Sequence, residues 1–204
     1  MVGLPQTIGD SDDPEKDFDR TSSDEDLRAF LTIVGTQAAT RVEIELGANI
    51  VEVVGAGPIP PSGPLDTLSL EIGPFDVINL ETAGFNSDFT GSVVRATQPV
   101  AVFVGSEASD VPTFGTYATR RCCADHLEEQ LLPDGSAGTT FVIARMPSRT
   151  AALTAAAADG VNLGVAIADE PEWVRVVATG AGETVITTTL PPPDDMHVIN
   201  ARMD

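Results

Sequence analysis

Apolar and polar side chains alternate with a period of two from residue 29 onward, and this pattern restricts the fold more than any other feature. The alternation is clearest in residues 41–46 (RVEIEL) and 67–72 (TLSLEI). A period of two turns one set of side chains towards a core, so both segments are predicted to be half-buried β-strands. Residues 100–104 (VAVFV) are apolar on both faces and are predicted to form a central strand.

Segments rich in Pro and Gly separate the predicted strands, most clearly in residues 55–64 (GAGPIPPSGP). Short strands with such breaks favour antiparallel sheets packed as sandwiches over a parallel sheet with crossover helices. Asn86, Asp88 and Gly91 suit a tight connection that reverses the chain before a strand at 92–96. The predicted fold class is all-β, with tandem antiparallel β-sandwich-like units.

Helix is expected in few places. One short helix or ordered loop is predicted near residues 123–132, where Leu127 and Leu131 would share one helical face. Residues 150–159 are rich in Ala and suit either a helix or a flexible surface segment.

The chain divides into three predicted parts. Residues 1–28 are acidic and poor in apolar side chains, so they are predicted to form a disordered acidic linker that packs on nothing as far as about residue 26. Their Asp residues lack the central Gly and terminal Glu of an EF-hand, which excludes that type of calcium loop. Residues 29–140 form the first predicted β unit, and residues 141–204 form a second, incomplete one.

An internal repeat is the basis for the second unit. Residues 31–42 align without gaps on residues 174–185, and residues 75–79 resemble residues 196–200. Each copy is predicted to form a strand, a turn and a strand, but only the first copy continues into an apolar central strand. The sheet that holds residues 196–202 is therefore expected to have an unpaired edge. Chance similarity between short strand pairs is the alternative.

The charge of the chain limits its partners. Its 204 residues include 31 acidic and 11 basic residues, for a net charge of −20. Such a surface repels phosphate backbones, so we expect no nucleic acid partner and no attraction to acidic membranes. No run is long and apolar enough to span a membrane, and no signal peptide is visible at the N-terminus. Scarce Lys fits either a salt-adapted source or a genome that favours Arg.

Residues 122–130 (CCADHLEEQ) hold both cysteines of the chain and one of its two histidines. The adjacent cysteines have three readings: a strained vicinal disulfide, bonds to cysteines outside the chain, or two free thiols. A disulfide across adjacent residues is strained because their Cα atoms lie only about 3.8 Å apart. The candidate cluster is Cys122, Cys123, Asp125, His126, Glu128 and Glu129.

A metal site is the more specific interpretation of this cluster, but the cluster supplies too few ligands. Structural zinc usually takes four ligands from two separated pairs, and the chain has one cluster without a second pair. We therefore predict no metal and no cofactor. The competing reading is architectural: His126 and the carboxylates pair with arginines and fix the segment on the sheet. The arginines available for this pairing are Arg120, Arg121, Arg145 and Arg149.

Catalytic patterns are weak, and no catalytic residue is predicted. Residues 105–109 (GSEAS) lack the Gly that a nucleophile elbow needs two residues after the serine. Tyr117 and Trp173 are the large amphipathic aromatic residues and are possible ligand contacts. Trp173 also suits a core or sheet-edge position.

Two patterns together carry a family resemblance. One is residues 88–91 (DFTG) leading to residues 98–103 (QPVAVF), and the other is the distinctive segment 122–130. Over roughly residues 75–204, and more loosely over 29–74, the chain resembles the bacterial branch of the IgGFc-binding protein N-terminal domain family.

The resemblance implies an extracellular or cell-surface, β-rich, non-enzymatic module for recognition or adhesion. It also implies a protein or glycan ligand and suggests that the chain is a piece of a longer secreted protein. Two other functions remain open: a metal- or thiol-dependent enzyme centred on residues 122–130, and a purely structural surface spacer.

Overall fold

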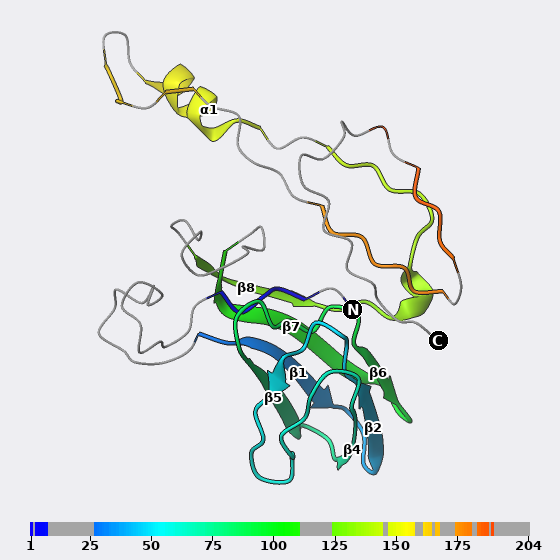
Figure 1. The fold of residues 1–204 in the computed structure, drawn as a ribbon. Coiled ribbons are helices and arrows are strands. Elements are labelled where there is room, and N and C mark those ends of the chain that lie inside the picture. The colour runs from blue at the N-terminus through cyan, green and yellow to red at the C-terminus, as the bar shows by residue number, and fades with distance from the viewer. Residues whose placement is uncertain are drawn as a thin grey trace.

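The computed structural model describes residues 1, 3–7, 27–110, 124–144, 147–157, 161–164, 166–167, 174–180, 183–187 and 189. Within these ranges the chain forms two antiparallel sheets that pack face to face, which confirms the predicted all-β, sandwich-like fold (Figure 1). Each sheet buries one face, and the two buried faces together make a single hydrophobic core.

The larger sheet has five strands and the smaller sheet has three. In spatial order, the larger sheet contains β3 (Glu52–Val53), β5 (Val77–Ala83), β1 (Ala29–Gly35), β7 (Val100–Ser109) and β8 (Asp125–Gln130). The smaller sheet contains β4 (Thr67–Ile72), β2 (Thr40–Glu45) and β6 (Val93–Ala96). After β8 the described residues form a 3₁₀ turn (Asp134–Ser136) and the helix α1 (Arg149–Ala156), which lies apart from the sheets in Figure 1.

The period-two pattern correctly predicted which side chains enter the core. In β1, Ala29, Leu31 and Ile33 are fully buried, whereas the residues between them are half-buried. In β2, Val42 and Ile44 are buried and their neighbours Arg41 and Glu43 are exposed. The apolar segment 100–104 lies within β7, a strand paired on both sides, as predicted for a central strand.

The connection between β5 and β6 is an irregular loop, as predicted for residues 86–91. No strand or helix runs through residues 84–92. Asn86 has φ 62°, and Gly84 and Gly91 also have positive φ values of 102° and 88°. Gly and Asn adopt this conformation more readily than other residues, which explains why they occur there.

The short helix or ordered loop predicted near residues 123–132 is wrong, because residues 125–130 form the strand β8. Leu127 and Leu131 suggested a helical face, but a spacing of four residues also places two side chains on one face of a strand. Pairing with β7 decides between the two, with Phe103 opposite Gln130 and Ser106 opposite Leu127. The Ala-rich segment does form a helix, α1, which Ser148 caps by accepting a hydrogen bond from the Ala151 N–H at 3.2 Å.

The expectation that the first residues pack on nothing is wrong for residues 3–7, of which Gln6 and Thr7 are at most 1% exposed. Backbone hydrogen bonds hold this segment, with the Gln6 N–H donating to Ser87 O and the Asn86 N–H donating to Gln6 O. The low apolar content of this segment suggested that it would pack on nothing. Its backbone N–H and C=O groups form hydrogen bonds regardless of the side chains. Residues 8–26 lie outside the described residues.

The second β unit stays a prediction. Among the described residues after Gln130 there is no strand, and residues 174–180 and 183–187, in the second copy of the proposed repeat, are irregular. The predicted free edge at residues 196–202 lies outside the described part of the chain.

Gly105 provides a test of how β7 and β8 pair. A Cβ at this position would lie 2.1 Å from Leu127 O and 2.7 Å from the Phe30 ring, so Gly105→Ala must push β8 away. We expect a loss of about 1–3 kcal/mol in the free energy of unfolding, measured by urea denaturation. Gly135→Ala is the control, since a Cβ there meets nothing within 4 Å. Equal stability of the two variants would contradict the observed pairing.

Candidate functional site

Four of the predicted site residues lie on β8, the last strand of the five-stranded sheet. A strand sends successive side chains to opposite faces, so Glu128 and Glu129 lie on different faces of the sheet. The four residues, all of them exposed, are Asp125, His126, Glu128 and Glu129. The remaining predicted residues, Tyr117, Cys122, Cys123 and Trp173, lie outside the described residues.

The His126 ring stacks on Phe30 of β1, although β7 lies between their two strands. The ring centroids are 6.1 Å apart and the planes differ by 19°. On β7, Gly105 pairs with Phe30 on one side and with Glu128 on the other. The Phe30 ring occupies space that a side chain at position 105 would fill. Glycine at this point therefore lets side chains from β1 and β8 touch across β7.

Within the described part of the chain, the β8 group contains one ion pair. His126 Nε2 lies 3.7 Å from Glu128 Oε2, and both side chains are about half exposed, so the pair contributes little to stability. Of the predicted arginine partners, Arg149 begins α1 and the others lie outside the described residues, so the predicted carboxylate–arginine pairs stay a prediction. In the same described ranges, no group of three or more His, Cys, Asp or Glu side chains is placed to hold a metal ion.

The most extensive feature of the described residues is the face of the five-stranded sheet that points away from the core, called the outer face below. Its side chains form rows, because residues opposite each other on neighbouring strands point to the same side. The rows, taken in order along β5 from its first residue, are an apolar row (Val77, Val34, Ala101), a middle row (Asn79, Thr32, Phe103, Gln130) and an acidic row (Glu81, Phe30, Gly105, Glu128).

Hydrogen bonds fix the polar part of the outer face. The Thr32 hydroxyl donates to Asn79 Oδ1 at 2.7 Å, and Asn79 Nδ2 donates to Glu81 Oε1 at 2.9 Å. The Glu81 carboxylate is therefore held in one orientation on the sheet. Such preorganised polar groups lose little side-chain entropy when a partner binds.

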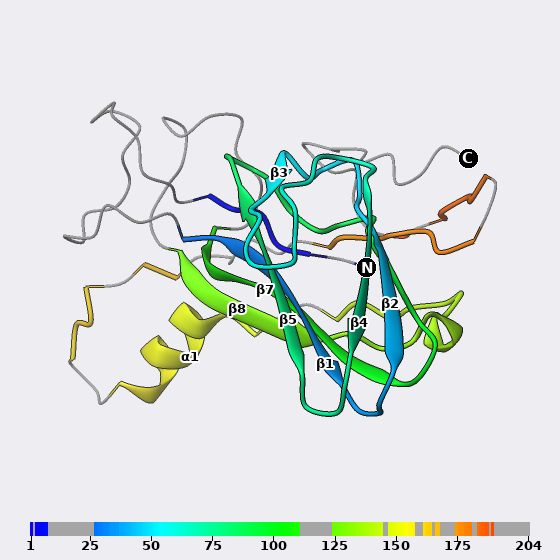
Figure 2. The ribbon, with the colours of Figure 1, turned by 90° about the horizontal axis from the view of Figure 1, so that it is seen from below.

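The apolar row continues past the end of the sheet. Phe75, in the turn before β5, is 88% exposed, and Val77 is 60% exposed. The Phe75 N–H donates to Gly35 O at 2.8 Å, which holds this turn against the end of β1. Figure 2 shows the β4–β5 and β1–β2 turns side by side at this end of the molecule.

Reactive side chains do not mark the outer face, so it was not predicted from the sequence. The signal was present: Phe30, Thr32 and Val34 alternate with the core residues of β1, which assigns them to the opposite face. Phe75 stands third in Gly-Pro-Phe-Asp, a turn pattern that places a side chain at an exposed tip.

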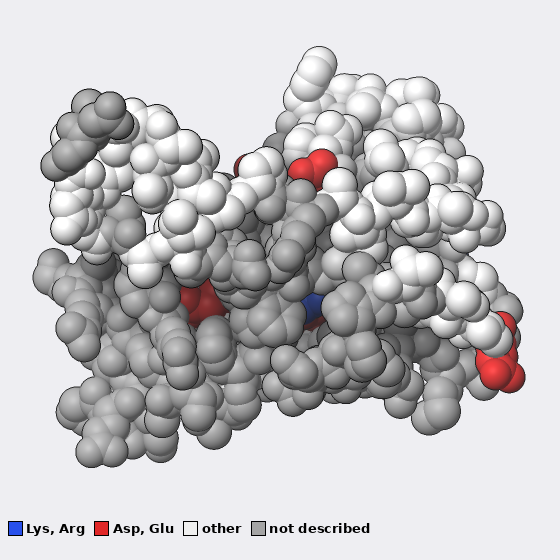
Figure 3. All heavy atoms as spheres, turned by 90° about the horizontal axis from the view of Figure 1, so that it is seen from above, with Lys and Arg blue, Asp and Glu red and all other residues white. Residues whose placement is uncertain are grey.

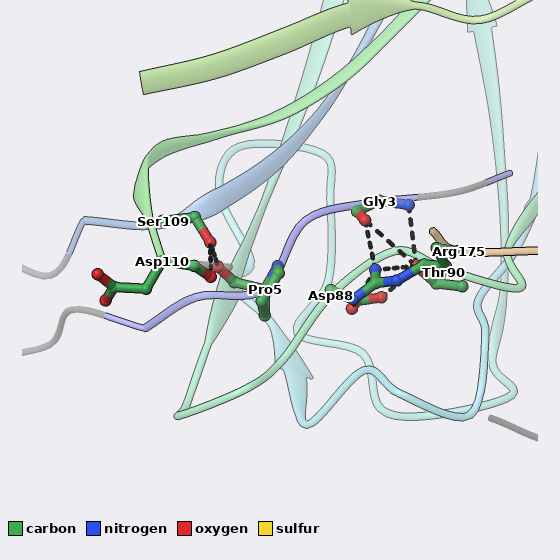
Figure 4. Close-up of polar contacts among 7 residues, drawn as sticks. All are labelled: Gly3, Pro5, Asp88, Thr90, Ser109, Asp110 and Arg175. Carbon is green, nitrogen blue, oxygen red and sulfur yellow. Dashed lines mark hydrogen bonds and ion pairs between the residues drawn. The ribbon is translucent and has the colours of Figure 1, made fainter. Parts of the chain in front are cut away.

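A buried polar network joins three distant parts of the chain (Figure 4). Arg175 Nη1 donates to Asp88 Oδ2 at 3.1 Å, to Thr90 Oγ1 at 2.9 Å and to Gly3 O. The Gly3 N–H in turn donates to Thr90 Oγ1 at 2.9 Å. The Asp88 side chain is 4% exposed, and a buried carboxylate needs such partners to offset the loss of water.

A second set of polar contacts lies at the end of β7. The Ser109 hydroxyl donates to Pro5 O at 2.7 Å (Figure 4). The Thr7 hydroxyl donates to Asp110 Oδ2 at 3.1 Å. The Asp110 N–H donates to Thr7 Oγ1 at 3.0 Å. These contacts connect the first residues of the chain to the loop and the strand end that they cross, so we assign this network a structural role.

The acidic side chains do not gather into one patch on the face shown in Figure 3. Those of the described residues lie apart from one another, and little basic surface is visible between them. The described acidic residues on this face therefore form no local anion cluster.

A double-mutant cycle tests the buried network. We expect Asp88→Asn and Arg175→Gln to couple by about 1–2 kcal/mol in the free energy of unfolding, because each leaves a partly buried group unpaired. The matched control is the exposed pair of Arg95 and Glu45, whose atoms lie 2.7 Å apart, and for which we expect about 0.5 kcal/mol or less. A coupling at Asp88–Arg175 that does not exceed the control would argue against the network.

Glu128→Ala tests the role of the β8 carboxylates. If these carboxylates were partly buried and paired with arginines, the loss of one would cost about 1–3 kcal/mol. Glu128 and Glu129 are exposed, so we now expect each substitution to change the free energy of unfolding by less than about 0.5 kcal/mol. A loss above about 1 kcal/mol in thermal or urea unfolding would restore the predicted arginine pairing.

Comparisons with known proteins give the family. A family model described as IgGFc binding protein matches residues 15–202. The IgGFc-binding protein of Homo sapiens is 28% identical over 129 residues, which are 63% of this chain but only 2% of the human protein. No solved structure matches the chain. Among the described residues, no helix has the length and apolar character to cross a membrane. The family match spans most of the sequence, so the chain belongs to the IgGFc binding protein family.

Proposed function

We propose that this chain is an extracellular or cell-surface recognition module that binds a protein and catalyses no reaction. The outer face of the five-stranded sheet is the observation that supports this most. It presents aromatic, apolar and acidic side chains in fixed rows, and the hydrogen-bonded strands beneath them are rigid. A rigid face with aromatic anchors is typical of protein-binding surfaces.

The size of the outer face supports a protein contact of modest affinity. Four strands spaced about 4.8 Å apart, over about 20 Å of strand length, give on the order of 400 Å². A contact of this size on each partner belongs with weak and transient interfaces, which bury less than about 1,200 Å² in total. We therefore expect a dissociation constant in the micromolar range for this module alone.

The family supports binding as the activity. The human relative is called an IgGFc-binding protein, which names a binding activity and not a reaction. The charge of −20 makes nucleic acid an unsuitable partner, and we propose that the chain inserts nowhere into a membrane. A glycan ligand is the second outcome that the binding experiment below distinguishes.

Several finer assignments belong to this proposal. We place the chain in the bacterial branch of the family and divide it into an acidic N-terminal region (1–28), whose residues 3–7 pack on the first unit, a first β unit (29–140) and a second, incomplete unit (141–204). Cys122, Cys123, Tyr117 and Trp173 remain proposed contributors to binding or architecture. Support for these assignments comes from the sequence patterns alone.

A binding screen tests the proposed function. The probes are an antibody Fc fragment, a panel of secreted proteins and a glycan array. We expect at least one protein to bind, and Phe30→Ser to weaken that binding by about tenfold or more, which is about 1.4 kcal/mol. Phe141→Ser is the control, because Phe141 is 72% exposed and belongs to neither sheet. Circular dichroism checks that both variants keep the fold.

Other outcomes of the screen select the alternatives. Binding to glycans without any protein would replace the protein ligand. No binding at all would favour a structural spacer. One equivalent of zinc in purified protein, lost in a Cys123→Ser variant, would favour an enzyme centred on residues 122–130.

A further inference from the structure

Two turns with the same sequence pattern flank β4. Gly-Pro-Leu-Asp (63–66) precedes this strand and Gly-Pro-Phe-Asp (73–76) follows it. In both turns the Asp Oδ2 accepts a hydrogen bond from the Gly N–H, at 2.8 Å and 2.7 Å, and the Asp N–H donates back to the Gly carbonyl at 3.3 Å. The pattern therefore builds one turn geometry at both ends of β4.

The third residue of each turn lies in the left-handed region, with φ 67° at Leu65 and 66° at Phe75. Glycine or asparagine is the inexpensive choice at such a position, because a bulky side chain there strains the backbone. Both side chains also point into water, since Leu65 is 70% and Phe75 is 88% exposed. Neither strain nor exposure helps the isolated fold, so such a residue marks a place to look for a contact outside the fold.

Phe75 differs from Leu65 in what lies next to it. The turn of Phe75 is held against the end of β1 and leads directly into Val77, the first residue of the apolar row. Val34 lies opposite Val77 on one side and opposite Ala101 on the other. Phe75 thus lies at the end of a row of apolar side chains that crosses three neighbouring strands, in which Val77 is 60% exposed and Val34 and Ala101 are half-buried.

The opposite end of the outer face is acidic. Four glutamates lie there on four strands, and Arg28 is the arginine at this end among the described residues, with its backbone N–H bound to Glu107. The acidic row lies about 14 Å from the apolar row along the strands. The glutamates are Glu52, Glu81, Glu107 and Glu128.

We propose that Phe75 and the apolar row form the anchor of the binding surface, and that its partner is a protein segment in which apolar residues lie next to basic residues. This inference rests on the recognition function proposed above and specifies the partner. Charge complementarity selects a basic neighbour for the acidic row. It also argues against a second copy of this chain, because two chains of charge −20 repel each other.

The test uses a defined probe and two matched variants. The probe is a short peptide whose first half is rich in Val and Leu and whose second half is rich in Arg. A peptide with Glu in place of Arg is its charge-reversed control. NMR spectra of the isotopically labelled chain report which backbone amides shift as each peptide is added.

We expect saturable shifts at Val34, Phe75, Val77 and Ala101 with the Arg peptide and none with the Glu peptide. Phe75→Gly should weaken this binding at least tenfold, while its thermal midpoint stays equal or rises, because glycine relieves the left-handed strain. Leu65→Gly makes the same backbone change at the other end of β4 and should bind as the parent chain does. Neither variant alters the charge, so loss at Phe75 alone cannot arise from general electrostatic attraction.

Two results would overturn the proposal: shifts that spread over other faces, or equal binding by the Phe75→Gly and Leu65→Gly variants. Concentration-dependent self-association that Phe75→Gly abolishes would assign the patch to a second copy instead. Every protein found in the binding screen is retested with both variants. A screen that yields neither a protein nor a glycan refutes the recognition function, whereas a bound protein that ignores Phe75→Gly refutes only this surface.

Discussion

The two sheets bury one face each against one another, and the rest of this structure depends on this interaction. Leu31 and Ile33 from the larger sheet meet Val42 and Ile44 from the smaller sheet, and all four side chains are fully buried. Each such side chain contributes roughly 1.5–3 kcal/mol when it leaves water. Because the inner faces are used in this way, alternation along each strand leaves the outer faces free to carry other side chains.

Polar contacts also stabilise the fold, because they satisfy the buried polar groups of the loop between β5 and β6. The loop between β5 and β6 buries Ser87, Asp88, Thr90 and Ser92, which would be costly without partners. The first residues of the chain and Arg175 supply partners for Asp88 and Thr90. Buried polar groups that are satisfied in this way define one arrangement of the backbone, since any shift would leave a donor or acceptor unpaired.

The sequence predicted the parts of the fold that depend on side-chain polarity. Alternation in 41–46 and 67–72 located β2 and β4, and the apolar segment 100–104 located β7. Leu127 and Leu131 misled the prediction of β8, because their spacing fits a strand as well as a helix. Residues 3–7 were missed because backbone groups hold them, and backbone groups leave little trace in composition.

The candidate site was harder to predict than the fold. The β8 group was chosen for its reactive side chains, yet a strand divides such a group between two faces. The outer face combines residues from four strands, and pairing register decides which of them are neighbours. Register depends on tertiary contacts that a single sequence does not specify. The turn pattern could have predicted that Phe75 is exposed, but it could not have predicted that Phe75 lies beside the apolar row.

The position of β8 has a consequence for aggregation. It is the last strand of the described sheet, and such strands offer backbone groups that can template the addition of another chain. Here the strand bears Asp125, Glu128 and Glu129, so an identical strand approaching it would bring like charges together. The acidic segment that stands out in the sequence would therefore oppose the addition of an identical strand to this end of the sheet.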